Sequence, residues 1–466
     1  MDPLVNAVLG ILFLVTGVVA LGLMFRLRGS ARSPAKKSSS RTAAPAVDRS
    51  KSPAKVESAA PPETKQHRDE FEPHMAMIHA MANSGSSIIE PMGTRVPLPA
   101  SWSDLLIKGA QLARLPLNED EPVNLQTTIG PAARQPLVVE MPILITHMSF
   151  GALSRDIKIA LAKGSAAVGT ATSSGEGGIL EDELQAAHRY IFEYVPHKYS
   201  VTDENLQRVD AIEIKIGQSA KPGMGGLVPA RKVTPEIAKI RGCSEGEDIG
   251  SPAHFDDIRT PEDLQRTVDE LRQRSDGRPI GIKIAAGNIE ADLEFALTAK
   301  PDFITIDGRP GATGAAPKVV KDATSVPTVF ALYRARKYLN EHAAQHVSLI
   351  ITGGLRISSD FAKALCLGAD AVAIGTAALM AAGCQQYRIC NTGRCPVGIT
   401  THDPALTRRL DIDQAAARVA NFLRVSAAEL MTFARLAGHD DIHDLAIADL
   451  CTTSAEISDH TDVEHV

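Results

Sequence analysis

The sequence predicts a (β/α)8 barrel, in which eight parallel strands form a closed ring and helices surround it. Short and almost wholly apolar runs recur beyond Trp102, and helical stretches separate them. Strands that are buried on both faces give such runs, and their alternation with helices indicates a parallel sheet. An open, doubly wound sheet is the alternative, but no G-x-G-x-x-G motif opens a first crossover helix.

The eight predicted strands follow one another along the chain. Their runs are PILITHMSF, AVGTATS, AIEIKI, IGIKIAA, FITIDG, PTVFAL, VSLIITGG and AVAIGTA. Barrel enzymes keep their chemistry at the carboxyl ends of the strands, so we expect the site in the segments that follow these runs. After the last two runs, Gly353, Gly354 and Gly375 would let a phosphate group approach backbone N–H groups, although tight turns explain single glycines equally well.

Two lysines lie within predicted strands, Lys215 in IEIKIG and Lys283 in GIKIAAG. An ammonium group in a barrel strand is costly unless an anion pairs with it. Flavin-binding barrels place a lysine beside the flavin edge on which negative charge develops, and an ordinary buried ion pair is the alternative. If both lysines converge on one face, they make a positive pocket that suits a flavin and a dicarboxylate.

The amino terminus differs in composition from the rest of the chain. Residues 3–25 carry no charge and are long enough to span a bilayer, whereas a cleaved signal peptide would have a positive start. The basic run that follows favours the cytoplasmic side. Residues 26–70 form a basic linker rich in Ser, Pro and Ala that cannot bury enough surface to fold. We therefore expect a single-pass membrane anchor, a flexible tether and a catalytic domain in the cytoplasm.

Three of the six cysteines lie in one segment, GCQQYRICNTGRCPVGIT, at Cys384, Cys390 and Cys395. A disulfide would leave one thiol over, and a structural zinc ion usually takes four ligands. Thiolates suit iron–sulfur clusters, and a run of cysteines that ends in Cys-Pro recurs in ferredoxin-type motifs. Three structural cysteines in a buried turn are the alternative. The net charge of −6 gives no indication of nucleic-acid binding.

The carboxyl-terminal part offers little chemistry. Helices over residues 411–448 are expected to cover the barrel or an oligomer interface, and residues 449–466 are expected to be a disordered tail. His439 and His443 have the spacing of a metal pair on a helix, but we favour a capping or packing role for them.

Several motifs are very specific when they occur together. They are MSFGALS, SSGEGG, IKIGQSAKPGMGGLVPARKV, DGRPGATGAAP, GTAAL and the cysteine segment, in this order. In these motifs the chain resembles the FMN and iron–sulfur synthase domain of glutamate synthase, and it looks most like the single-domain, archaeal-type or N-methylglutamate synthase-like members. The resemblance implies that residues 71–410 are an FMN-binding (β/α)8 domain, with the cluster loop after the eighth strand.

The resemblance also implies roles for individual residues. The cluster would be [3Fe-4S], held by Cys384, Cys390 and Cys395. Catalysis would depend on Glu176, Lys215 and Lys221. The substrate-binding residues would be Lys215, Lys221, Arg241 and Gly175. The FMN-binding residues would be Met148, Ser149, Gly151, Lys283, Asp307, Gly308, Gly353, Gly354, Gly375 and Thr376.

The implied activity is the reduction of a 2-imino acid. In the family, ammonia condenses with 2-oxoglutarate, and the flavin reduces the resulting 2-iminoglutarate to glutamate. A ferredoxin or a redox subunit is the implied electron donor, in preference to NAD(P)H. Because the chain opens on an apolar segment and shows no N-terminal cysteine nucleophile, we expect ammonia or an amine to come from solution or from a separate amidotransferase subunit. A homo-oligomer is also consistent with the resemblance.

Two positions depart from the family pattern. Leu227 stands where Gln is usual after the KPGxGG motif, and Ala312 replaces one glycine of a pair in the loop over the flavin. The alternative function is an FMN-dependent barrel oxidoreductase that acts on another 2-oxo or 2-hydroxy acid and has no cluster. Such oxidases place a catalytic histidine near the flavin, and the sequence offers no clear candidate.

Overall fold

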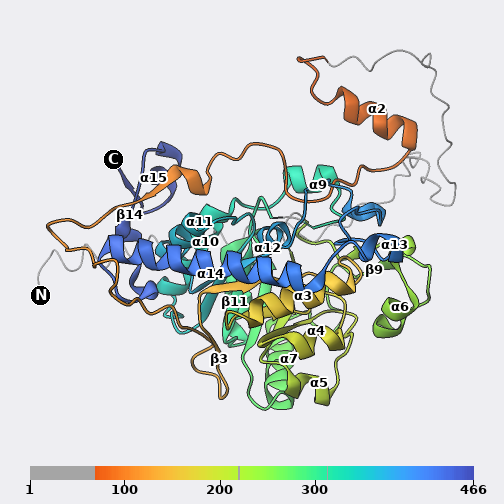
Figure 1. The fold of residues 1–466 in the computed structure, drawn as a ribbon, viewed down its shortest axis with the longest axis horizontal. Helices are drawn as coiled ribbons and strands as arrows, with labels where there is room; N and C mark the ends of the chain where they lie inside the picture. Colours follow the sequence, from red (N-terminus) through yellow and green to blue (C-terminus); the bar gives the residue numbers. More distant parts are fainter. Residues whose placement is uncertain (1–68, 219–220, 312) are drawn as a thin grey trace, which may run out of the picture. The chain divides into compact units, whose positions relative to one another are not determined.

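The computed structural model describes residues 69–218, 221–311 and 313–466 (Figure 1). The predicted membrane segment 3–25 and almost all of the predicted linker lie outside the described residues. Within the part of the chain that the structure describes, no helix is both long and apolar enough to cross a bilayer.

An eight-stranded parallel sheet forms the centre of the molecule, and its strand order is β4-β13-β12-β11-β10-β7-β6-β5. Along the chain, β4 is the first of these strands and β13 is the last, and the two pair with each other. The sheet therefore curls into a nearly closed barrel, as predicted. The strands are β4 (Ile143–Ile145), β5 (Ala171–Ser173), β6 (Arg189–Tyr194), β7 (Ala211–Lys215), β10 (Ile280–Ala285), β11 (Phe303–Asp307), β12 (Ser348–Thr352) and β13 (Ala371–Ile374).

Side chains close the seam between β4 and β5, the two strands at the ends of this sheet. Thr170 Oγ1 donates to the Ile143 carbonyl at 2.6 Å, and Ser173 Oγ donates to the Ile145 carbonyl at 2.9 Å. The buried Nζ of Lys158 adds three hydrogen bonds. It donates to the carbonyl of Met148, which follows β4, and to those of Ser173 and Ser174 at the end of β5. Hydroxyl and ammonium donors thus take the place of backbone ladder bonds at the seam.

One predicted strand is wrong, and one strand was missed. PTVFAL begins helix α10 (Thr328–Glu341), and its apolar residues Val329, Ala331 and Leu332 are the buried face of that helix. Helix and strand cannot be told apart from so short an apolar run. The missing strand is β6, whose sequence RYIFEY carries charges at Arg189 and Glu193.

Helices surround the barrel and alternate with its strands, as Figure 1 shows. They are α3 (Arg155–Ala166), α4 (Glu181–Ala186), α5 (Asp203–Arg208), α7 (Pro261–Arg274), α8 (Ile289–Thr298), α10, α11 (Ser358–Cys366) and α12 (Thr376–Ala381). Smaller elements are α2 (Met75–Ser84), α6 (Pro235–Arg241), α9 (Lys318–Ala323), α13 (Pro404–Thr407), β2 (Thr127–Ile129), β3 (Leu137–Val139), β8 (Leu227–Val228) and β9 (Ile249–Gly250).

The predicted helical segment 411–448 is mainly one long helix, α14 (Ile412–Ala437), which lies against α3 (Figure 1). The two helices approach so closely that a Cβ on Gly164 would lie 2.7 Å from the Val419 side chain. Glycine is therefore required at this crossing. As predicted, α14 covers the barrel.

The carboxyl-terminal segment is ordered, which corrects the prediction of a disordered tail over 449–466. Strand β14 (Leu450–Thr452) pairs antiparallel with β1 (Leu105–Ile107), and β15 (Glu464–His465) pairs parallel with β14. Helix α15 (Ala455–His460) lies between them in sequence, and its Ile457 is fully buried. The few apolar residues of this acidic segment are spaced so that they reach the core.

The histidines of this region have packing roles, as expected. His439 Nε2 lies 2.9 Å from Asp449 Oδ2, and His443 Nε2 lies 3.0 Å from Thr127 Oγ1. Each histidine therefore joins α14 or the turn after it to another segment of the domain.

Candidate active site

A cavity lies at the carboxyl ends of the barrel strands, where the sequence predicts the site; we call it the active-site cavity. Several loops from distant parts of the chain meet there. The predicted residues that line it are Met148, Ser149, Gly151, Glu176, Lys215, Lys221, Arg241, Lys283, Asp307, Thr376 and Cys390. The fold therefore brings together most of the residues that the sequence singled out.

The other predicted glycines lie close by, but they are not among the described residues that line the cavity: Gly175, Gly308, Gly353, Gly354 and Gly375. Their packing explains why two of them are glycine. A Cβ on Gly353 would lie 2.1 Å from the Gly308 carbonyl oxygen, and one on Gly354 would lie 2.4 Å from the Pro310 ring. Both also have positive φ, at +108° and +91°. Tight turns thus account for these two residues, and their role at a phosphate stays a prediction.

A buried ion pair joins the ends of two strands. Lys215, the last residue of β7, pairs with Glu176 of the loop after β5, and the two side chains are 9% and 10% exposed. Burial raises the pKa of Glu176, but the charge of Lys215 and its hydrogen bond outweigh burial, so the pKa lies below its usual value. Burial likewise lowers the pKa of Lys215, and the carboxylates of Glu193 and Glu176 more than reverse this. Both groups are therefore ionised.

Lys221 adds a second cation beside this pair. Its Nζ donates to the Gly225 carbonyl within the loop that follows β7. Burial, together with the charge of Lys215, lowers the pKa of Lys221 to about 8. An anionic ligand in the cavity would stabilise the ammonium form, because it adds the opposite charge that the loop does not supply.

Arg241, at the end of α6, reaches the same cavity from outside the barrel. One terminal nitrogen donates to the Phe150 carbonyl at 2.7 Å, and the guanidinium lies over the Tyr199 ring, 5.5 Å from its centroid. The buried Nε has no hydrogen-bond partner among the described residues. The side chain is thus held in place with a donor still available for a carboxylate.

Lys283 lies directly beside Lys215, since β10 pairs with β7 in this register. Its side chain is 4% exposed, and its Nζ lies 3.8 Å from Asp307 Oδ2 at the end of β11. Both lysines line the cavity, which meets the condition under which the sequence indicates a positive pocket. Cations at this depth favour an anionic ligand.

The three cysteines of the predicted cluster line a second, smaller cavity, the cysteine cavity. Cys390 begins the short helical turn Cys390–Thr392 and lines the active-site cavity as well. All three are free thiols, and burial raises the pKa of Cys384 and of Cys390. Thiolates are unfavourable in such a place unless a cation binds to them.

Comparison with known proteins decides the family. Residues 74–440 match the family model described as the conserved region in glutamate synthase. A glutamate synthase large subunit-like protein of Rhizobium meliloti (strain 1021) is 36% identical over 402 residues, which are 82% of this chain and 91% of that protein. The chain belongs to the glutamate synthase family.

Other relatives of this chain carry more specific names. A protein of Methanocaldococcus jannaschii named archaeal glutamate synthase [NADPH] is 36% identical over 398 residues, which are 79% of this chain and 78% of that protein. Among solved structures, a flavocytochrome b2 variant gives a TM-score of 0.48 at 17% identity, over 76% of this chain and 77% of that one.

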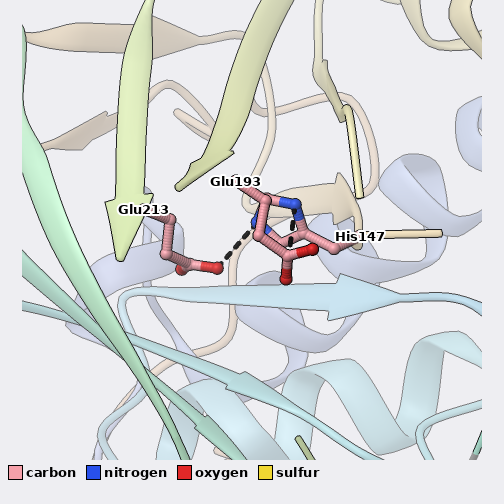
Figure 2. Close-up of side chains that lie close together, drawn as sticks. All are labelled: His147, Glu193 and Glu213. Atoms are coloured by element: carbon pink, nitrogen blue, oxygen red, sulfur yellow. Dashed lines mark ion pairs between the residues drawn. The ribbon is translucent and has the colours of Figure 1, made fainter. Parts of the chain in front are cut away.

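The structure shows further residues in the active-site cavity of this protein that the sequence analysis did not identify. His147, between β4 and the MSFG motif, lies with its ring between Glu193 of β6 and Glu213 of β7 (Figure 2). The signal in the sequence was a charged or polar residue within each of three strand segments, ITHMS, YIFEY and AIEIK.

Lys232 was also missed, although it lies in a motif that carries the family resemblance. Its Nζ donates to the Ala152 carbonyl at 2.7 Å and lies 3.5 Å from the Cys390 carbonyl. Burial lowers the pKa of Lys232 to about 8 even though thiolates at Cys390 and Cys395 would raise it. This lysine therefore supplies a positive charge beside the cysteines.

The two departures from the family pattern have different outcomes. Leu227 begins β8, is 42% exposed and lines the active-site cavity, so a polar contact there is replaced by an apolar one. Ala312 lies outside the described residues.

Proposed function

We propose that the protein binds FMN and a [3Fe-4S] cluster and reduces a 2-imino acid, 2-iminoglutarate in the first place, to glutamate or a related amino acid. The observation that carries this proposal is that Lys215, Lys221 and Arg241 line the same cavity as Lys283 and Cys390. One cavity thus offers several cations to a dicarboxylate and a flavin, and it borders the cysteines.

The residues present fit both groups. Lys283 is a buried cation whose nearest carboxylate, on Asp307, lies beyond hydrogen-bond distance at 3.8 Å, which suits an additional anionic partner such as a reduced flavin ring. Cys384, Cys390 and Cys395 line one small cavity, and buried thiols are suitable ligands for iron. When bound, the cluster would pass electrons one at a time, and FMN would deliver them in pairs as hydride.

The chain's own residues would do the rest of the work. Lys221 and Arg241 would bind the carboxylates of the 2-oxo acid through charge-assisted hydrogen bonds. Glu176, which Lys215 holds ionised, would accept and return protons while ammonia adds to the ketone and water leaves. Gly226 packs against the Glu176 carboxylate, and a Cβ there would lie 2.5 Å from Oε2, the oxygen that pairs with Lys215.

The electron donor and the location are parts of the same proposal. A ferredoxin-like protein or a redox subunit would deliver electrons near Cys390, and an amidotransferase subunit would supply ammonia. Several relatives are named for NADPH, so a subunit that oxidises NADPH is one form of this donor. The apolar segment 3–25 would anchor the protein in the membrane, with the catalytic domain in the cytoplasm and subunits associated as a homo-oligomer.

The first test is an anaerobic absorption spectrum of the purified full chain, with flavin, iron and acid-labile sulfide measured on the same sample. The proposal expects one FMN with about three irons and four sulfides per chain, and turnover of 2-oxoglutarate with ammonia under a one-electron donor. Cys390→Ser should lose the iron and keep FMN, whereas Cys451→Ser, a buried cysteine in β14, should keep both. Neither cofactor in the wild type would contradict the proposal.

One observation favours the alternative function, a flavin barrel without a cluster. His147 lines the active-site cavity, so this cavity does contain a histidine, for which the sequence offered no clear candidate. FMN without iron, together with oxidation of a 2-hydroxy acid that His147→Gln abolishes, would establish this alternative.

A further inference from the structure

A buried group of three titratable side chains lies at the floor of the active-site cavity. Among the described residues, His147, Glu193 and Glu213 are the one set of three His, Cys, Asp or Glu residues whose ligand atoms all lie within 4.8 Å of one another (Figure 2). His147 Nε2 lies 2.7 Å from Glu213 Oε2, and Nδ1 lies 3.9 Å from Glu193 Oε1. The side chains are between 2% and 6% exposed, so the ring is held between two carboxylates away from bulk water.

The two ring nitrogens face different surroundings. Glu213 is not among the described residues that line the cavity, whereas His147 and Glu193 both line it. Nδ1 is buried and has no hydrogen-bond partner among the described residues. Since buried polar atoms are nearly always bonded, this nitrogen is suited to a partner that enters the cavity.

Positive groups surround the three residues, which argues against a metal ion at this place. Lys215 acts on Glu193, and Lys283 acts on Glu213. Glu176 and Asp307 pair with the same two lysines on the cavity side, and Thr305 donates to Glu213. Both carboxylates of the group thus already have ammonium neighbours, and a divalent ion would meet their repulsion.

The proposed reaction needs a proton at this depth. Each hydride that reduces an imine consists of two electrons and one proton, but a cluster held by cysteine thiolates passes electrons alone. Unbalanced negative charge is costly in a site shielded from water. A group beside the cavity must therefore give a proton for every pair of electrons that enters.

We propose that His147 is this proton donor. Its Nδ1–H bond breaks when the proton passes into the cavity. The Nε2–H bond stays intact and keeps donating to Glu213, whose carboxylate stabilises the ring before the transfer, when both nitrogens carry a proton. The Glu193 carboxylate then takes a proton from solvent in the cavity and passes it to Nδ1, so both residues return to their starting state. The oxidant and reductant are unchanged by this step, because His147 and Glu193 move protons only.

Glu193 has access to water from the active-site cavity itself, because it is one of the residues that line this cavity. A proton from solvent that enters the cavity can therefore reach its carboxyl group.

The test measures proton uptake with a pH-indicator dye while reduced methyl viologen, a one-electron donor that releases no proton, reduces the FMN-loaded protein, which makes it independent of any 2-oxo acid. His147→Gln keeps a polar side chain but cannot pass a proton, and we expect uptake to slow about 100-fold. His439→Gln changes a comparable histidine–carboxylate pair that is remote from the cavity, and we expect a change of less than about twofold. Equal rates in wild type and His147→Gln would overturn the proposal.

A second readout does not need the cofactor. In the flavin-free protein, ¹⁵N resonances of the His147 ring should move in both Glu213→Gln and Glu193→Gln, and a ring that responds to neither would overturn the proposal. A stoichiometric divalent metal that is lost in His147→Gln would also overturn it. The inference rests on the proposed function, but coupled proton uptake without turnover of 2-oxoglutarate would contradict that function alone.

Discussion

Two buried lysine–glutamate pairs in the same barrel have different partners and different uses. Lys158 lies 2.7 Å from Glu183, and its Nζ also donates to the carbonyls of Met148, Ser173 and Ser174. Lys215 pairs with Glu176, and both of these side chains line the active-site cavity. The exposed fractions are 2% or less in the first pair and about one-tenth in the second.

The difference shows how a buried charge serves either structure or function. Three carbonyls and a carboxylate use all the donors of Lys158, and Tyr190 donates to the second oxygen of Glu183. The pair therefore has no hydrogen-bonding group left for a ligand. Its role is to join β4 to β5. Lys215 and its neighbours face a cavity instead, so their remaining hydrogen-bonding capacity is available to a substrate.

The largest effect is expected from Lys158→Met. The substitution removes one of the donors of the barrel seam and leaves the Glu183 carboxyl group buried without its cation, so the free energy of unfolding should fall by about 3–5 kcal/mol. Chemical denaturation followed by circular dichroism measures this loss. A loss below 1 kcal/mol, roughly that of a single hydrogen bond, would show that the seam does not depend on this lysine.

Lys215→Met should have the opposite balance of effects. Glu176 keeps the Ser251 hydrogen bond, the charge of Lys221 and access to the cavity, so we expect a stability loss of only about 1 kcal/mol. Affinity for 2-oxoglutarate should fall on the order of 100-fold, because the proposed site loses a charge that would contact the ligand. The comparison would fail if Lys215→Met destabilised the protein as strongly as Lys158→Met.

Lys221 makes the binding depend on pH. Burial and the charge of Lys215 lower its pKa to about 8, so the ammonium form that attracts a carboxylate is lost as pH rises through this value. We expect the affinity for 2-oxoglutarate to be constant below pH 8 and to fall about tenfold per pH unit above it. Titrations by calorimetry at a series of pH values measure this.

Lys221→Arg provides the control for this pH dependence. A guanidinium group stays charged, so the alkaline fall in affinity should disappear. If the fall persists in this variant, Lys232 is responsible, because burial lowers the pKa of that lysine to the same value.

The smallest effect is expected from Leu227→Gln, which restores the residue usual in the family. Leu227 is 42% exposed at the edge of the cavity, so stability should change by less than about 0.5 kcal/mol. KM for the 2-oxo acid should fall about twofold, by roughly the free energy of one exposed hydrogen bond. An unchanged KM would place Leu227 outside the contacts with substrate.

The sequence predicted the barrel because most of its strands are buried on both faces and contain few charges. The prediction missed β6, because two charged residues interrupt its apolar run. Glu193 lines the cavity, and Arg189 pairs with Asp210. The prediction also failed at PTVFAL, where the buried face of α10 imitates a strand over its first turn and a half. Both errors arise because a short window shows burial but not the period of the element.

The site was predicted where family motifs name the residues, and it was incomplete elsewhere. Glu176, Lys215 and Lys221 do line one cavity, although Glu176 follows β5 whereas the two lysines come from the end of β7 and the loop after it. His147 follows β4, whereas Glu193 and Glu213 lie on the paired strands β6 and β7, and only the closure of the barrel brings the three side chains together. A contact of this kind depends on register across the sheet, which no local pattern in the sequence reveals.

The pairing of β1 with β14 also has a consequence for the synthesis of the chain. Thr452 Oγ1 donates to the Asp104 carbonyl across 348 residues, and the barrel itself closes only when β13 reaches β4. Domains fold as units while they leave the ribosome, and contacts this distant in sequence form late. Growing chains that lack residue 452 would therefore hold an exposed strand edge, so their folding should depend on chaperones until this residue has been synthesised.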